Sequence, residues 1–142
     1  MALWLFKVEP DCYSFADLKR DKKTNWDGVS NAAAQKNLRA VAKGDRVLYY
    51  HTGDEKAVVG IAEVIGGPTI DPADDAGKKV YVTVKPVTAL AAPVTLAAIK
   101  ADPAFAGWEL VRLPRLSVMP VTVEYWARVE ELAGVRRNEP GV

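Results

Sequence analysis

The chain has 142 residues, of which 49% are hydrophobic and 26% charged, and its formal net charge is +1. This length and composition are typical of one globular domain with an ordinary core, and they exclude the global positive field of a strongly cationic nucleic-acid binder. The single cysteine excludes an intramolecular disulfide and a cysteine-rich zinc site. No long apolar run and no signal-peptide pattern is present, so we expect a cytoplasmic protein without membrane contact.

The N-terminal segment predicts a strand followed by a capped helix. Residues 2–7 are a short apolar run rich in aromatics, which is typical of a buried strand. Ser14 and Asp17 have the spacing of a helix capping box, and we expect a short helix from there to Arg20. The polar run over residues 21–25 is expected to be a loop. One domain over residues 1–134 and a flexible tail over residues 135–142 are the expected organisation.

The stretch WDGVSN combines an aromatic residue, a turn and a helix start. Trp26 beside such a turn either packs in the core or presents its flat face to a planar ligand, with its indole N–H available to donate. Asn31 precedes a run of strong helix formers and is a good N-cap, and the N–H groups of that first turn favour an anion. The same helix is expected to carry three basic residues along one side, as a solvated face or a phosphate contact: Lys36, Arg39 and Lys43.

Two central strands are predicted over residues 46–51 and 56–64, rich in Val, Ile and Tyr and joined by a turn that contains Gly53. Apolar residues occupy both odd and even positions of each strand, so both faces of the strand are expected to be covered, as in a small barrel. The first strand ends in Tyr50 and His51, which makes it a plausible wall of a pocket. His51 alone is more often a structural hydrogen-bonding residue than a ligand contact, and both interpretations stay open.

The C-terminal half predicts further short elements. Residues 79–87 alternate well enough to be a strand, although Pro86 places its end at an edge. Thr95 is expected to cap a short helix through Lys100, and Thr122 a final helix that stops at Gly134. Extended segments are expected over residues 109–112 and 116–121. Strands mixed with short helices, without regular alternation, favour the α+β class.

Enzyme signatures are missing from the sequence. It contains no GxSxG, no P-loop, no GxGxxG and no pair of His residues at metal-ligand spacing. With one Cys and one His in the sequence, Cys12 and His51 are the one pair that could act as a Cys–His nucleophile. A half-buried Cys12 that packs as a small hydrophobe is the simpler interpretation. We therefore expect no enzyme activity, no cofactor and no metal, although an acid–base pair of carboxylates stays open.

Six segments in register resemble the EVE domain, a member of the PUA-like superfamily related to YTH and ASCH domains. They are WLFKVEPDCYSFADL, WDGVSN, KGDRVLYYH, GIAEV, PVTLAAIKADP and RLSVMPVT. The resemblance implies a β pseudo-barrel of about five or six strands with flanking short helices. It also implies a reader of modified bases, chiefly modified cytosine in DNA, rather than a catalyst.

By position, the resemblance implies a ligand pocket made from four segments. Its residues would be Lys7, Trp26, Val29, Asn31, Tyr50, His51, Ser117 and Val118. The chain departs from the family pattern at three positions, where Val8, Ser30 and Met119 stand in place of Ser, Arg and Gln. The missing Arg removes a contact to phosphate or base, which leaves the ligand's identity open.

Three hypotheses follow for the function. The first is a non-enzymatic module that binds a modified nucleobase in DNA or RNA, with Trp26 as the stacking platform. The second is a small-molecule sensor or an RNA-binding accessory protein that uses the same pocket. The third is a nucleotide-directed hydrolase, which needs a carboxylate within hydrogen-bond reach of His51. The expected partner is nucleic acid carrying a modified base, and a monomer is favoured.

Overall fold

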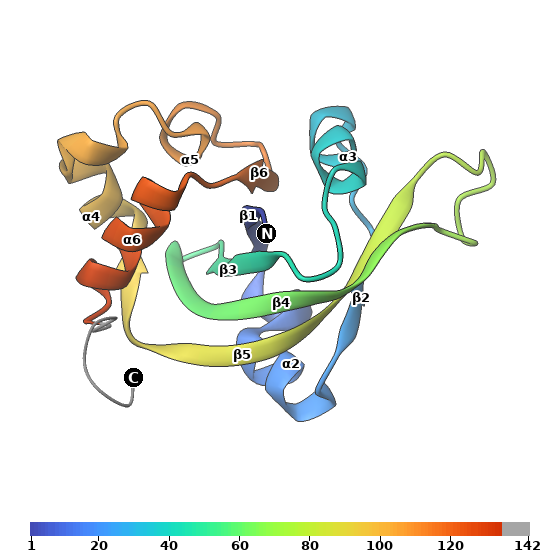
Figure 1. Cartoon of the computed structure of the whole chain (residues 1–142), viewed down its shortest axis with the longest axis horizontal. Coiled ribbons are helices and arrows are strands. Elements are labelled where there is room, and N and C mark those ends of the chain that lie inside the picture. Colours follow the sequence, from blue (N-terminus) through green and yellow to red (C-terminus); the bar gives the residue numbers. More distant parts are fainter. Residues whose placement is uncertain (135–142) are drawn as a thin grey trace.

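The computed structural model describes residues 1–134, whose strands form one six-stranded sheet in the order β2-β5-β4-β3-β1-β6. The sheet is strongly curled into a half-barrel, with short helices at its ends and flanks (Figure 1). Its strands are β1 Leu3–Val8, β2 Thr24–Trp26, β3 Arg46–His51, β4 Ala57–Ile70, β5 Val80–Thr95 and β6 Val118–Pro120. The α+β class and the pseudo-barrel with short helices are therefore confirmed.

The helices are all short. They are α1 Pro10–Tyr13, α2 Phe15–Asp21, α3 Ala32–Arg39, α4 Leu96–Ala101, the 3-10 turn η1 Pro103–Phe105, α5 Glu109–Arg112 and α6 Val123–Leu132. None of the helices within residues 1–134 is long and apolar enough to cross a membrane. The tail expected over residues 135–142 lies outside the described residues.

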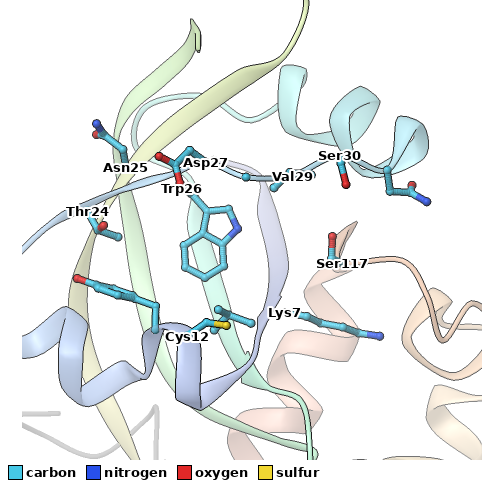
Figure 2. Close-up of a pocket in the computed structure, with 13 residues that line it drawn as sticks. Lys7, Cys12, Thr24, Asn25, Trp26, Asp27, Val29, Ser30 and Ser117 are labelled. Atoms are coloured by element: carbon cyan, nitrogen blue, oxygen red, sulfur yellow. The ribbon is translucent and has the colours of Figure 1, made fainter. Parts of the chain in front are cut away.

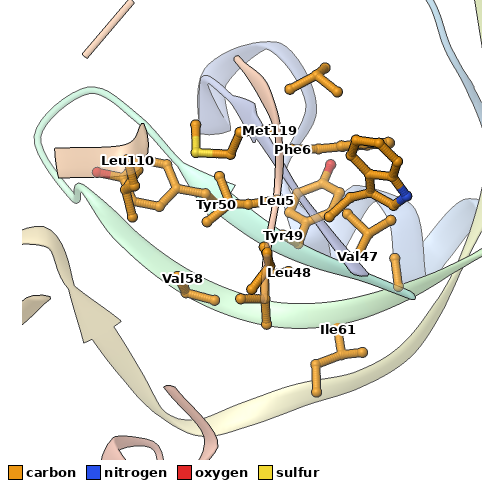
Figure 3. Close-up of a cluster of buried hydrophobic side chains, with 14 of the residues drawn as sticks. Leu5, Phe6, Val47, Leu48, Tyr49, Tyr50, Val58, Ile61, Leu110 and Met119 are labelled. Atoms are coloured by element: carbon orange, nitrogen blue, oxygen red, sulfur yellow. The ribbon is translucent and has the colours of Figure 1, made fainter. Parts of the chain in front are cut away.

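Strands β1 and β3 are paired in parallel, and in this pair Phe6 lies opposite Tyr49 and Lys7 opposite Tyr50. All other strand pairs are antiparallel. Five consecutive residues of β3, from Val47 to His51, are buried, so both faces of this strand are covered as expected (Figure 3). Consecutive side chains on a strand point to opposite faces, and this alternation decides which aromatic residues reach which side of the sheet.

The predicted helix caps are confirmed. The Ser14 hydroxyl accepts from the Asp17 N–H at 3.1 Å, and the Asp17 carboxylate accepts from the Ser14 N–H at 2.9 Å, which completes a capping box. The side chains of Asn31, Thr95 and Thr122 each accept a hydrogen bond from the N–H three residues later. These local hydrogen bonds satisfy donors that the first helical turn leaves without partners.

Several predicted boundaries are wrong. Helix α3 ends at Arg39, so Lys43 does not lie along its side. The Asp45 carboxylate accepts from the Ala42 N–H at 2.9 Å, while the Asp45 N–H donates to the Ala42 carbonyl, and this local turn replaces the next helical turn.

Two further segments differ from expectation. Residues 109–112 form helix α5 rather than an extended segment, since the Arg112 N–H donates to the Trp108 carbonyl at 3.1 Å and the Leu113 N–H to the Glu109 carbonyl at 2.7 Å, as in a helical turn. Strands β4 and β5 continue well beyond their expected ends, and residues 24–26 pair with β5 as a strand instead of a loop. Pro86 lies opposite Ala62 next to a register shift, which accommodates a residue that cannot donate to the ladder.

Candidate functional site

A cavity of about 520 Å³ opens beside the end of β2, at the edge of the curled sheet (Figure 2). Its volume falls within the roughly 300–1,000 Å³ typical of small-ligand sites. Its walls come from β1, α1, β2, the loop over residues 27–31 and the residue before β6. The lining residues are Lys7, Val8, Cys12, Tyr13, Thr24, Asn25, Trp26, Asp27, Gly28, Val29, Ser30, Asn31 and Ser117.

Trp26 forms the aromatic wall of this cavity. Its ring packs against Phe6 at 5.4 Å and edge-on against Tyr49 at 5.3 Å between centroids, and only 7% of the residue is exposed. The indole N–H groups of Trp4 and Trp108 have acceptors, whereas that of Trp26 has none among the described residues. Its nitrogen lies on the side of the ring that faces Val29 and Ser117 (Figure 2). The indole is thus held rigidly from behind while its donor is available to a ligand.

The loop over residues 27–31 is fixed by backbone geometry and by a buried amide. Gly28 has a φ of +73°, a left-handed conformation that glycine adopts without steric cost. The Gln35 amide donates to the Val29 carbonyl at 2.7 Å, and its side chain exchanges two hydrogen bonds with the Val80 backbone. Gln35 therefore ties the cavity loop to β5, and no local sequence signal predicted this role.

Lys7 borders the cavity without a carboxylate partner among the described residues. Its ammonium donates to the Pro114 carbonyl at 3.0 Å and lies 5.6 Å from the centre of the Tyr50 ring. Figure 2 shows the amine nitrogen at the end of the side chain that points away from Trp26. Burial lowers the pKa of Lys7, because desolvation disfavours the charged form.

The cavity is polar but nearly neutral. Among the described residues, Lys7 and Asp27 are the only charged ones in its lining, and most of the others carry amide or hydroxyl groups or are apolar. Such a lining matches a flat, uncharged heterocycle that stacks on an aromatic side chain and presents donors and acceptors at its edge. It is poorly matched to a phosphate group, because only one cation faces it.

The structure brings five of the eight residues predicted to bind the ligand to this cavity, namely Lys7, Trp26, Val29, Asn31 and Ser117. It does not bring Tyr50, His51 and Val118 there. Side-chain alternation explains Tyr50, since Phe6 and Tyr49 face Trp26 whereas Tyr50 points to the opposite side with Lys7. Val118 is fully buried. Contact with a ligand stays a prediction for all eight residues.

His51 has structural partners on both ring nitrogens. Its Nε2 accepts from the Phe15 N–H at 3.0 Å, so the proton lies on Nδ1 and is donated to Glu55 at 2.7 Å. A carboxylate is therefore within reach, as the hydrolase hypothesis requires. The nitrogen that would act as a base, Nε2, nevertheless already accepts the Phe15 N–H. The ring also does not line the Trp26 cavity.

None of the basic residues expected to contact phosphate lines the cavity. Lys36 and Arg39 are exposed on α3, and Arg39 donates to the Lys78 carbonyl at 2.9 Å. Lys43 follows the helix in the turn before β3. Their phosphate contacts stay a prediction, but the three residues do not form one line of charge.

Sequence reasoning missed a set of cavity residues. Tyr13, Thr24, Asn25 and Asp27 line the cavity, and Tyr49 supports Trp26 from behind. Cys12 is exposed and lines the cavity, so the expectation of a half-buried packing residue was wrong. The missed signal was the polar run before Trp26, which forms an edge strand instead of a loop. Within residues 1–134, no group of three His, Cys, Asp or Glu residues is placed to hold a metal ion.

The curled half-barrel with short flanking helices is a PUA-like fold. An ASCH protein from Zymomonas mobilis has a similar structure, with a TM-score of 0.58 and 12% identity over 92% of this chain and 95% of that one. At this identity, the likeness shows the fold alone. The chain belongs to the EVE domain family, whose profile matches residues 2–132.

Solved relatives cover the chain almost completely. A protein from Rhodopseudomonas palustris is 39% identical over 100% of both chains, with a TM-score of 0.92. Human THYN1, solved in complex with DNA containing 5-methylcytosine, is 25% identical over 99% of this chain and 100% of that one, with a TM-score of 0.86.

The curated sequence of human thymocyte nuclear protein 1 is 34% identical over an alignment of 74 positions, and the match covers 44% of this chain. The matched stretch spans 33% of the length of that protein.

Proposed function

We propose that this chain is a non-enzymatic reader module that binds a modified nucleobase, modified cytosine or a similar base, in DNA or RNA. The observation that carries this proposal is Trp26, a rigid indole with an available N–H at the wall of a nearly neutral cavity of about 520 Å³. The human relative solved with 5-methylcytosine-containing DNA supports the same class of ligand.

The chemistry of the walls fits a base turned out of its strand. The base stacks on Trp26, which is worth about 1–3 kcal/mol for one aromatic side chain. The Asp27 carboxylate is a suitable acceptor for an exocyclic amino group such as that of cytosine. Val8 and Val29 offer apolar surface to an added methyl group, since such contacts distinguish methylated from plain pyrimidines.

A binding role is favoured over hydrolysis by the position of His51. Its ring lies outside the cavity, and both nitrogens have partners within the protein. A base poised for catalysis must instead reach a proton of the bound substrate.

The test is fluorescence anisotropy with short single-stranded oligonucleotides that differ only in one 5-methylcytosine, as DNA and as RNA. We expect tighter binding of the methylated oligonucleotide, and an affinity about 10–100-fold lower for Trp26→Ala, from the loss of one stacking platform. Tyr81→Ala is the matched control, because this half-buried aromatic on β5 does not line the cavity.

Two results separate the alternatives. Equal affinity of the unmodified protein for plain and methylated oligonucleotides would remove the reader proposal. Tight binding of a free metabolite in a thermal-shift screen, with no binding of any oligonucleotide, would support a small-molecule sensor instead.

A further inference from the structure

A second cavity, of about 290 Å³, lies on the other side of Lys7. Tyr50 and three lysines line it, together with apolar residues that include Leu96 and Leu110. Within residues 1–134, Lys7 is the one residue that borders both this cavity and the Trp26 cavity. The two cavities are therefore neighbours along the surface, with the Lys7 side chain between them.

The three lysines are Lys7, Lys56 and Lys100, and none of them forms an ion pair within the described residues. The β3–β4 turn carries two acidic residues, and its Glu55 accepts a hydrogen bond from His51 Nδ1 at 2.7 Å. Asp54 and Glu55 both line a neighbouring groove with Lys56 and Lys100. Three lysines against these two carboxylates thus leave a formal excess of one positive charge around the second cavity.

Backbone contacts hold this cluster in place. The Leu96 N–H donates to the Lys56 carbonyl at 2.7 Å, which joins the start of β4 to the first residue of α4. Lys100 follows Leu96 by four residues, which is about one helical turn, so its side chain lies on the same side of α4. Lys7 is fixed by its hydrogen bond to the Pro114 carbonyl and by the Tyr50 ring beneath its ammonium.

The geometry points to a path for the nucleic-acid strand: we propose that the strand flanking the bound base leaves the Trp26 cavity past Lys7. Its phosphates then bind at the second cavity, between Lys56 and Lys100. This inference rests on the proposed function. The supporting argument is charge complementarity, because the Trp26 cavity accepts the base but offers phosphates one cation, whereas its neighbour offers three.

The experiment measures oligonucleotide affinity as a function of salt for the double variant Lys56→Gln/Lys100→Gln, over roughly 50 to 200 mM salt. The probe is a short single strand with one 5-methylcytosine. The matched control is Lys19→Gln/Lys85→Gln, which removes the same charge from two exposed lysines that line neither cavity. A charge-keeping variant, Lys56→Arg/Lys100→Arg, tests for rescue.

We expect the double variant to bind about tenfold more weakly, with a salt slope shallower by about 1.4, which is about 0.7 for each lost phosphate contact. Its affinity for the free nucleoside 5-methyl-2′-deoxycytidine is expected to stay unchanged, which also shows that the variant is folded. The control keeps the salt slope of the unmodified protein, and the arginine variant restores it.

Other outcomes overturn the inference. A slope that changes no more than in the control would remove the strand path, and so would a loss confined to Lys36→Gln/Lys43→Gln. Equal affinity for the oligonucleotide and for a single nucleotide 5′-monophosphate would show that one phosphate, not a strand, binds there.

The proposed function fails separately. If the lysine dependence holds while plain and methylated strands bind equally, the strand path stands and the reader function falls. If the unmodified protein binds no oligonucleotide, both are overturned.

Discussion

Two aromatic clusters at opposite parts of the sheet have similar composition but different surroundings. Around Trp108, the ring of Phe105 lies at 5.5 Å and that of Tyr125 is stacked at 5.2 Å, and Trp108 is fully buried. Its indole N–H donates to the Pro120 carbonyl at 3.3 Å. Around Trp26, two aromatic rings lie at similar distances, but the indole borders a cavity and its N–H has no partner among the described residues.

The difference lies in the donor, not in the burial. Trp26 is only 7% exposed, so accessible surface alone would assign both residues to the core. A core tryptophan normally finds an acceptor for its N–H within the protein. An indole that is clamped by other rings and still has an available donor beside a cavity is arranged for a ligand.

The largest effect is expected at the sealed cluster. Trp108→Ala removes a fully buried side chain and leaves a cavity between Phe105 and Tyr125, which lowers the free energy of unfolding by about 3–5 kcal/mol. Urea denaturation measures this change. Oligonucleotide affinity of the folded fraction is expected to stay the same, because Trp108 lines neither cavity. Val123→Ala, at an exposed position of α6, is the control and changes stability by less than about 0.5 kcal/mol.

A third tryptophan extends the contrast to pH. The Trp4 indole donates to the buried Asp45 carboxylate at 2.9 Å, and the N–H groups of Ala2 and Ala42 donate to the same carboxylate. Burial alone raises the pKa of Asp45, but these hydrogen bonds outweigh it and hold the pKa below its ordinary value. We expect Asp45→Asn to lower the free energy of unfolding by about 2 kcal/mol at neutral pH.

The sign of the pH dependence follows from the lowered pKa of Asp45. Its contribution is fully present above the unfolded value of about 3.9 and is lost as the pH falls through the lower folded pKa. The unmodified protein and Asp45→Asn should therefore converge in stability below about pH 4. A constant difference between them down to the acid transition would show that the carboxylate charge is not what holds Trp4.

Local signals predicted the parts of this fold that depend on local chemistry. The capping box at Ser14 and Asp17 and the caps at Asn31, Thr95 and Thr122 were readable because each cap acts within four residues. The ends of β4 and β5 could not be predicted from the sequence, because the two strands pair with each other beyond their apolar runs.

The site was predicted in part, for the same reason. Trp26 and Asn31 stand beside a turn signal, whereas the choice between Tyr49 and Tyr50 depends on the register of β1 against β3. That register is a contact between segments about 40 residues apart, and no local pattern encodes it. Gln35 was missed because its hydrogen-bond partner Val80 lies 45 residues away.

The smallest expected effect separates the two clusters most sharply. Trp26→Phe keeps an aromatic ring at the cavity wall but removes the indole N–H. We expect affinity for the methylated oligonucleotide to fall by about 1 kcal/mol, roughly fivefold, because one hydrogen bond to the ligand is lost. The free energy of unfolding should change by less than about 1.5 kcal/mol, since one apolar ring replaces another. Anisotropy and urea denaturation on the same samples measure both.

The matched variant is Trp108→Phe, which removes an N–H that donates to the Pro120 carbonyl. We expect the opposite pattern, with no change in affinity and a loss of about 2–3 kcal/mol in the free energy of unfolding, because the Pro120 carbonyl loses its donor and a fully buried side chain becomes smaller. Because the two substitutions are chemically identical, any difference between them reports on the surroundings of each indole. If both variants lose stability equally and neither loses affinity, the Trp26 donor is not directed at a ligand and the contrast between the clusters disappears.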